Sequence, residues 1–218
     1  MANNRSRSDA RARPRGAAFL SVLLVAAAVA ADALVRCLHR TWRLTHETRQ
    51  LTLLSRIDPL TGLHNRRHME EHLAIAVSAA RRHRQPLSVL FLDIDGFKHI
   101  NDELGYDSGD EVLRAVGERM RRALRAEDLV GRWGGEEFVA VLPTTNLPGA
   151  VVVAERVRAA VAIEPVCVVD RDTHVTVSVG CTSGVGEPAE LILEAGRALR
   201  QAKRAGKNRV IAAGSSPD

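Results

Sequence analysis

The sequence predicts a single α/β domain of about 155 residues, preceded by an N-terminal hydrophobic helix and a helical stalk. Three observations support this fold class. Residues 87–93 form an unbroken apolar run typical of a buried strand, 129–142 contain two short β runs joined by Gly134-Gly135, and stretches with helical apolar spacing separate the strands. A hydrophobic content of 45% and a charged content of 26% are typical of a globular chain.

The positive charge is concentrated in the first 57 residues, which hold ten Arg against Asp9, Asp32 and Glu47. Residues 58–218 hold 21 basic and 23 acidic side chains, so the predicted domain has a net charge of −2. An acidic domain does not favour a nucleic-acid backbone, and the seven aromatic residues of the chain are too few for a stacking surface. We therefore expect no nucleic-acid partner.

The N-terminal 35 residues divide into a polar and an apolar part. Residues 1–15 contain five Arg and no apolar pattern, which predicts a basic disordered tail. Residues 16–35 contain one charged side chain, Asp32, and have about the length that an α-helix needs to cross a bilayer. We expect a transmembrane helix here. Two other interpretations stay open, namely a signal peptide cleaved near Ala28-Val29-Ala30 and a buried Ala-rich helix.

Residues 36–57 predict a polar helical stalk, in which Leu44, Leu51 and Leu54 have heptad-like spacing. Such a helix leaving a membrane would suit dimerisation. Five Arg precede the hydrophobic run and five follow it, so the positive charges give no orientation. We expect a single-pass protein of the inner (cell) membrane whose main domain is cytoplasmic.

The first helix and strand of the domain are bounded by turn and capping residues. Asp58-Pro59 ends the stalk, and Asn65 predicts the N-cap of a helix that ends near Arg84. Gln85-Pro86 stops this helix before the strand at 87–93, because proline cannot continue it.

The remaining elements include both helices and strands. The predicted helices are 109–126, 148–162 and 189–205, and the predicted strands are 129–133, 138–142, 174–180 and 209–212. Gly134-Gly135 predicts a tight hairpin between the first two of these strands. Residues 213–218 are a short C-terminal tail.

Two acidic clusters lie at the ends of predicted strands. Asp93-Ile94-Asp95 follows the apolar strand, and Glu136-Glu137 lies in the hairpin. Solvated loop acids are the simpler interpretation of either cluster alone. Together they predict a site for a hard divalent cation such as Mg²⁺, which takes oxygen ligands and shares them with substrate phosphates. The neighbouring glycines would let a triphosphate lie against the backbone.

Three other chemistries are not supported by the sequence. Asp93–Gly96 begins like an EF-hand loop, but Phe97 and Lys98 occupy positions where that loop needs an acid and a glycine. Gly206-Lys207-Asn208 lacks the upstream glycine and the Ser/Thr of a P-loop. No G-x-S-x-G pattern indicates covalent catalysis.

Several motifs follow one another between residues 58 and 212. They are Asp58–Arg67 (DPLTGLHNRR), Leu92–Asp102 (LDIDGFKHIND), Gly105–Asp110 (GYDSGD), Gly134–Phe138 (GGEEF), Val175–Gly180 (VTVSVG) and Gln201–Lys203 (QAK). In sequence and order they resemble the motifs of the GGDEF domain family, the diguanylate cyclases. The resemblance implies that residues 58–212 are a GGDEF catalytic domain with a palm-like central β-sheet wrapped by helices, as in nucleotidyl cyclases.

The resemblance also implies roles for individual residues. Asp93, the carbonyl of Ile94 and Glu136 would bind two Mg²⁺ ions, with Mn²⁺ as a substitute. Asn101 and Asp110 would hydrogen-bond the guanine edge and so select GTP. The other substrate-binding residues would be Phe97, Lys98, Gly134, Gly135, Lys203 and Lys207.

The implied reaction joins two GTP molecules into cyclic di-GMP and releases two pyrophosphates. Because each 3′-hydroxyl attacks the α-phosphate of the other GTP, the reaction requires a homodimer of domains. Glu136 or Glu137 would accept the proton of the hydroxyl, and the choice between them stays open. The alternative is a catalytically silent GGDEF domain that binds cyclic di-GMP or GTP as a receptor or scaffold.

Arg125-Ala126-Glu127-Asp128 fits an R-x-x-D pattern shortly before Gly134. In the resembled family this position holds an inhibitory product site. The resemblance implies that Arg125 and Asp128 bind cyclic di-GMP, with Arg156 contributed by a partner subunit. An ion pair at a helix end is the simpler interpretation.

Overall fold

The computed structural model of the chain describes Arg36, His39 and residues 56–214. Residues 56–214 form one compact unit. The predicted tail at 1–15, the predicted membrane helix at 16–35 and most of the stalk at 36–57 lie outside the described residues. Among the residues that are described, no helix has the length and apolar character needed to cross a membrane.

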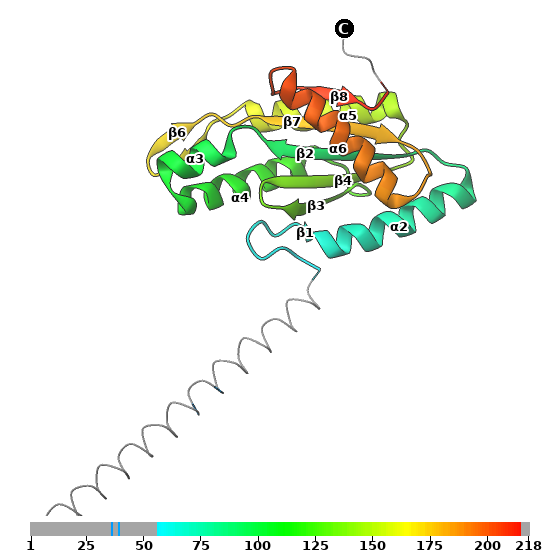
Figure 1. Cartoon of the computed structure of the whole chain (residues 1–218), viewed down its shortest axis with the longest axis horizontal. Coiled ribbons are helices and arrows are strands. Elements are labelled where there is room, and N and C mark those ends of the chain that lie inside the picture. Colours follow the sequence, from blue (N-terminus) through cyan, green and yellow to red (C-terminus); the bar gives the residue numbers. More distant parts are fainter. Residues whose placement is uncertain (1–35, 37–38, 40–55, 215–218) are drawn as a thin grey trace, which may run out of the picture. The chain divides into compact units, whose positions relative to one another are not determined.

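A six-stranded mixed sheet with the strand order β1-β3-β4-β2-β7-β8 lies at the centre of the domain (Figure 1). Its strands are β1 (His64–Asn65), β2 (Leu87–Ile94), β3 (Leu129–Gly134), β4 (Glu137–Pro143), β7 (Val177–Ser183) and β8 (Val210–Ala212). The central pairs are antiparallel, whereas β1 with β3 and β7 with β8 are parallel. The short strands β5 (Val166–Val168) and β6 (Arg171–Thr173) form a separate hairpin.

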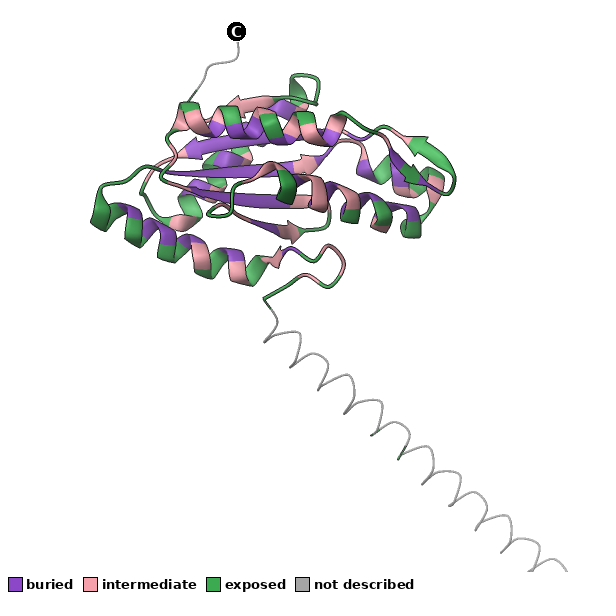
Figure 2. Cartoon of the chain, turned by 180° about the vertical axis from the view of Figure 1, so that it is seen from behind, coloured by how far each residue is buried: buried purple, intermediate pink, exposed green. Residues whose placement is uncertain are grey.

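Helices cover both faces of the sheet. They are α2 (Arg66–His83), α3 (Phe97–Leu104), α4 (Tyr106–Ala123), α5 (Leu147–Ala162) and α6 (Pro188–Arg204). Leu90 and Leu92 of β2 pack with the α3, α4 and α5 side, whereas Val89 and Phe91 pack with α2 and α6. Figure 2 shows the central strands buried along most of their length. Burial on both faces explains the unbroken apolar run of β2 and confirms the predicted α/β class.

The caps of α2 agree with the sequence prediction. The side chain of Asn65 accepts a hydrogen bond of 3.0 Å from the backbone N–H of His68, and it thereby satisfies a free donor at the start of the helix. Arg84 ends the helix in a left-handed conformation with φ of 53°, and its N–H bonds the carbonyl of Ala80. The helix predicted at 109–126 is α4, which spans 106–123 and so begins and ends three residues earlier.

Other elements were absent from the sequence prediction or lie at shifted positions. No element was predicted at α3, an eight-residue helix between Gly96 and Gly105, or at the β5–β6 hairpin. The strand predicted at 174–180 is β7 at 177–183. Its partner β2 ends at Ile94, so Thr176 pairs only with the loop that follows, where its carbonyl accepts from the N–H of Asp95 at 2.9 Å.

Candidate functional site

Lys203 of α6 lies at the end of β2 and contacts two oxygens that the sequence analysis assigned to a metal. Its ammonium donates to Asp93 Oδ1 and to the carbonyl of Ile94, the latter at 3.1 Å. Asp95 Oδ1 lies 3.5 Å from the same nitrogen. The side chain of Lys203 is 26% exposed and that of Asp93 is 17% exposed. The Asp93 Oδ1 and the carbonyl oxygen of Ile94 therefore converge on the position of the Lys203 ammonium, which carries a positive charge.

The glycine-rich hairpin brings the second acidic cluster to the first. β3 ends at Gly134 and β4 begins at Glu137, so Gly135 and Glu136 form the turn. Glu137 stands opposite Asp93 in the β2–β4 register, and the carbonyl of Glu136 accepts from the N–H of Ile94 at 3.3 Å. The predicted meeting of the two clusters is thus present in the structure.

The backbone of this turn is open to a ligand. Gly135 has φ of +50°, a conformation that glycine adopts without the penalty of a side chain. A Cβ atom added to Gly134 or Gly135 would meet no atom within 4 Å. The space beside the turn is therefore open.

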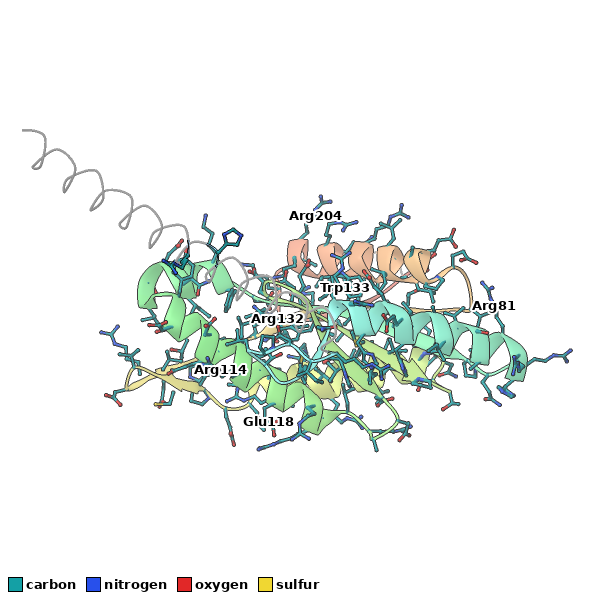
Figure 3. All side chains as sticks on the ribbon, turned by 90° about the horizontal axis from the view of Figure 1, so that it is seen from below. Arg81, Arg114, Glu118, Arg132, Trp133 and Arg204 are labelled. Carbon is teal, nitrogen blue, oxygen red and sulfur yellow. The ribbon has the colours of Figure 1, made fainter. Side chains whose placement is uncertain are left out.

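Arg132 holds the turn against the start of the domain. Its Nε donates to the carbonyl of Gly135 at 2.9 Å, and its Nη1 lies 3.4 Å from Asp58 Oδ1. The adjacent Trp133 lies between α2 and α6 (Figure 3), where the guanidinium of Arg66 sits 4.8 Å from its ring centroid. These contacts fix the position of the end of β3, immediately before the turn.

The three facing carboxyl groups repel one another. Burial raises the pKa of Asp93, and the hydrogen bond and charge of Lys203 oppose that rise. Burial and the nearby charge of Asp93 also raise the pKa of Glu136 and the pKa of Glu137. A cation bound between them would relieve this repulsion.

The donors at this point suit a hard divalent cation. Within the described residues no three His, Cys, Asp or Glu side chains gather as a metal site. The donors that do converge are the carboxylate of Asp93 and the backbone carbonyl of Ile94, and the charges of Asp93 and Lys203 both act on Glu136. Few protein ligands, all of them oxygen, are typical of Mg²⁺, which keeps waters and substrate phosphates in its shell.

Asp95 differs from its neighbours because its carboxylate is already satisfied and is only 5% exposed. Its Oδ2 accepts from Thr176 Oγ1 at 2.8 Å and from the N–H of Asn208 at 2.9 Å, and its Oδ1 accepts from Ser178 Oγ at 2.7 Å. The sequence analysis grouped Asp95 with the metal-binding acids. Its contacts instead tie β2 to β7 and to the turn that contains Lys207.

The residues predicted to bind guanine lie where α3 meets α4. A Cβ added to Gly109 would lie 1.9 Å from Asn101 Oδ1, so the glycine leaves room for this amide. Asn101 Oδ1 is buried and accepts no hydrogen bond from any described residue. Asp110 follows Gly109 and is half-buried, while Phe97 is buried and Lys98 is exposed. An unpaired acceptor beside a half-buried carboxylate can receive N–H donors from a ligand.

The R-x-x-D segment forms a turn in the loop between α4 and β3. Asp128 Oδ2 accepts from the N–H of Arg125 at 3.0 Å, and the N–H of Asp128 donates to the carbonyl of Arg125 at 3.2 Å. The Arg125 side chain is 61% exposed, and its Nη1 lies 3.9 Å from Glu127. Arg156 is exposed on α5, and no hydrogen bond or ion pair joins it to Arg125 in the described part of the chain.

The helix α6 forms a wall of the cavity beside the acids that was not predicted from the sequence. A cavity of about 410 Å³ is lined by Asp93, Glu137 and Lys203, and also by α6 residues that include Gly196 and Arg200. Lys203 lies seven positions after Gly196 and three after Arg200, a spacing that places all three on one face of a helix. In the sequence, only that spacing links the three residues. It does not indicate a site unless the position of α6 against the sheet is known.

Comparison with known proteins identifies the family. Residues 55–209 match the family described as diguanylate cyclase, GGDEF domain. The response regulator PleD of Caulobacter vibrioides is 44% identical over 159 residues, which are 71% of this chain and 35% of PleD. The chain therefore belongs to the diguanylate cyclase GGDEF domain family, and it matches about a third of the length of this relative.

Solved structures agree with this assignment. The GGDEF domain of DgcB from Caulobacter crescentus, solved with c-di-GMP, superposes with a TM-score of 0.71 at 31% identity, covering 73% of this chain and 94% of that one. The active GGEEF domain of a diguanylate cyclase from Vibrio cholerae gives a TM-score of 0.65 at 36% identity, covering 70% of this chain and 98% of that one. The mixed sheet and the helices around it are thus those of the family.

Proposed function

We propose that this protein is a diguanylate cyclase that condenses two GTP molecules into cyclic di-GMP and two pyrophosphates. The observation that carries the proposal is the convergence of the Asp93 and Ile94 oxygens on a positive charge beside the open turn at Gly135. The Vibrio cholerae relative is described as an active GGEEF domain, and this chain has the same five residues at 134–138. Glutamate at position 136 is therefore compatible with activity.

Asp93, the carbonyl of Ile94 and Glu136 would hold two Mg²⁺ ions, and Mn²⁺ could replace them. When bound, such cations lower the pKa of the attacking hydroxyl and neutralise charge on the leaving pyrophosphate. Glu136 and Glu137 are the two candidates to accept the proton of the 3′-hydroxyl, since Glu136 lies in the turn and Glu137 stands opposite Asp93.

The substrate would lie across the cavity beside α6. Asn101 and Asp110 would recognise guanine, because the amide oxygen of Asn101 is unpaired and the Asp110 carboxylate can accept two N–H groups. Phe97 would bound the pocket, and Gly134 with Gly135 would admit the phosphates. The phosphate-binding cations would be Lys98, Lys203 and Lys207.

Catalysis would require two copies of the domain. One domain presents one set of these residues, and the product contains two guanosines joined by two new phosphodiester bonds. A membrane helix at 16–35 and a stalk at 36–57 would hold two copies together at the inner membrane, with the catalytic domain in the cytoplasm. Bringing the two sites face to face then replaces a slow encounter by an intramolecular one.

Cyclic di-GMP would inhibit its own synthesis at Arg125 and Asp128, with Arg156 reaching over from the partner subunit. The exposed guanidinium of Arg125 is able to form a bidentate contact with phosphate. Arg125→Ala should raise the final yield of cyclic di-GMP, and unchanged inhibition by added product would contradict this assignment.

The decisive experiment is to incubate the full chain with GTP and Mg²⁺ and to detect cyclic di-GMP by mass spectrometry. Product from the wild type but not from an Asp93→Ala, Glu136→Ala double variant would support the cyclase. A dimeric wild type that binds cyclic di-GMP yet makes none would support the silent receptor. Glu137→Gln separates the two candidate bases: if Glu137 is the base, this variant keeps GTP binding and loses turnover.

A further inference from the structure

The cavity between α6 and the ends of β2 and β4 contains one charged group that the proposed reaction has not used. Its sheet side carries the acids Asp93 and Glu137, and its helix side carries Lys203 and Arg200. Lys203 is engaged by Asp93 and by the carbonyl of Ile94, so its charge is largely compensated. Arg200 is exposed and makes no hydrogen bond or ion pair with any described residue.

The side chain of Arg200 folds back along α6 toward the preceding turn. A methyl group placed on Gly196, four residues earlier, would lie 3.8 Å from Arg200 Nη1. Both residues line the cavity, and Lys203 follows one turn later on the same face of the helix. The guanidinium therefore lies against the cavity wall near Gly196, about two helical turns (about 10 Å) before the Lys203 position.

We propose that Arg200 binds the terminal phosphates of the GTP held at this site. The inference rests on the proposed function. The α-phosphate must react beside Asp93 and Glu136, and the long Arg200 side chain, which leaves α6 one turn before Lys203, can extend along the same cavity wall to the distal end of the triphosphate. Arg200 then stays with the pyrophosphate when the bond to the α-phosphate breaks.

The test uses the full chain with 3′-deoxy-GTP, which lacks the attacking hydroxyl and is not consumed, and with GMP, which lacks the terminal phosphates. Arg200→Gln should weaken the binding of 3′-deoxy-GTP by about tenfold or more, because a charge-assisted bidentate contact is lost. The affinity for GMP should stay the same. Arg200→Lys should restore only part of the loss, since an ammonium cannot reproduce the fork of the guanidinium.

Arg197→Gln is the matched control, because Arg197 lies one turn earlier on the same helix and lines a different cavity. It should bind 3′-deoxy-GTP as the wild type does. Equal binding by Arg200→Gln and the wild type would overturn the inference and leave the proposed function standing. Equal losses in the two Gln variants, or an equal loss for GMP, would also overturn it. A wild type that binds no nucleotide would overturn the proposed function as well.

Discussion

Gly180 of β7 lies directly beneath α6, and we expect Gly180→Ala to destabilise the domain strongly. A Cβ at this position would lie 2.1 Å from the carbonyl oxygen of Ala195 and 2.2 Å from the backbone nitrogen of Leu199. Heavy atoms in contact are normally about 3.5 Å apart, so α6 would have to move by roughly 1 Å. Both neighbours are backbone atoms, so no side-chain rotation relieves the clash. Overpacking of this severity costs about 3 kcal/mol.

Thermal unfolding followed by circular dichroism measures this cost. For a domain of this size, a loss of about 3 kcal/mol lowers Tm by about 6–12 °C. Gly196→Ala is the control on the other side of α6, because its Cβ would meet only Arg200 Nη1 at 3.8 Å. That variant should gain about 0.5–1 kcal/mol from the better helix propensity of alanine. A Tm for Gly180→Ala within about 2 °C of the wild type would refute the close packing of α6 on β7.

The same substitution should affect the candidate site through α6. Lys203 lies one turn after Leu199, and a shift of the helix would separate its ammonium from Asp93. A misplacement of about 1 Å can reduce a reaction rate about 100-fold. At a temperature where Gly180→Ala is still folded, turnover of GTP should therefore fall by more than the folded fraction does. Turnover that falls only with the folded fraction would contradict this coupling.

Three smaller perturbations test other contacts. Asp95→Ala leaves two hydroxyls and a backbone N–H without their buried acceptor and should cost about 3 kcal/mol in urea unfolding, more than Asp95→Asn. Asn65→Ala removes the N-cap of α2 and should cost about 1 kcal/mol in the same assay. Burial lowers the pKa of His64, of His68 and of His72, so the folded state favours their neutral forms. The stability that comes from keeping these histidines neutral is complete above pH about 6.5 and is lost as the pH falls below it. His68→Gln should therefore reduce the fall in Tm between pH 7.5 and pH 5.5.

Much of the fold could be predicted from the sequence because its signals are local. The capping oxygen of Asn65, the proline after Gln85 and the two-sided burial of β2 each leave a mark within a few residues. The short helix α3 and the β5–β6 hairpin could not be predicted in the same way. α3 has eight residues and no side-chain N-cap, so its formation depends on packing against α4.

In the candidate site, too, the features that depend on local sequence were predicted and those that depend on packing were not. The acids at 93 and 136–137 were predicted to meet because both lie at strand ends and the hairpin fixes one of them. The burial of Asp95 beneath Thr176 and Ser178 was not predicted, since it depends on the register of β7 against β2. The position of Arg200 depends on where α6 docks, which no local pattern of the sequence encodes.

The contact between Lys203 and Asp93 joins residues 110 positions apart, and the contact between Asn208 and Asp95 spans 113. Closing such long loops is entropically costly, so we expect these pairs to form late in folding, after the local β3–β4 hairpin and the helices. A chain emerging from the ribosome can pair β2 with β4 and so assemble its acids before α6 has been synthesised. Until α6 docks, those acids face water without their cation. The positive charge that balances these acids therefore arrives only when α6 docks on the sheet.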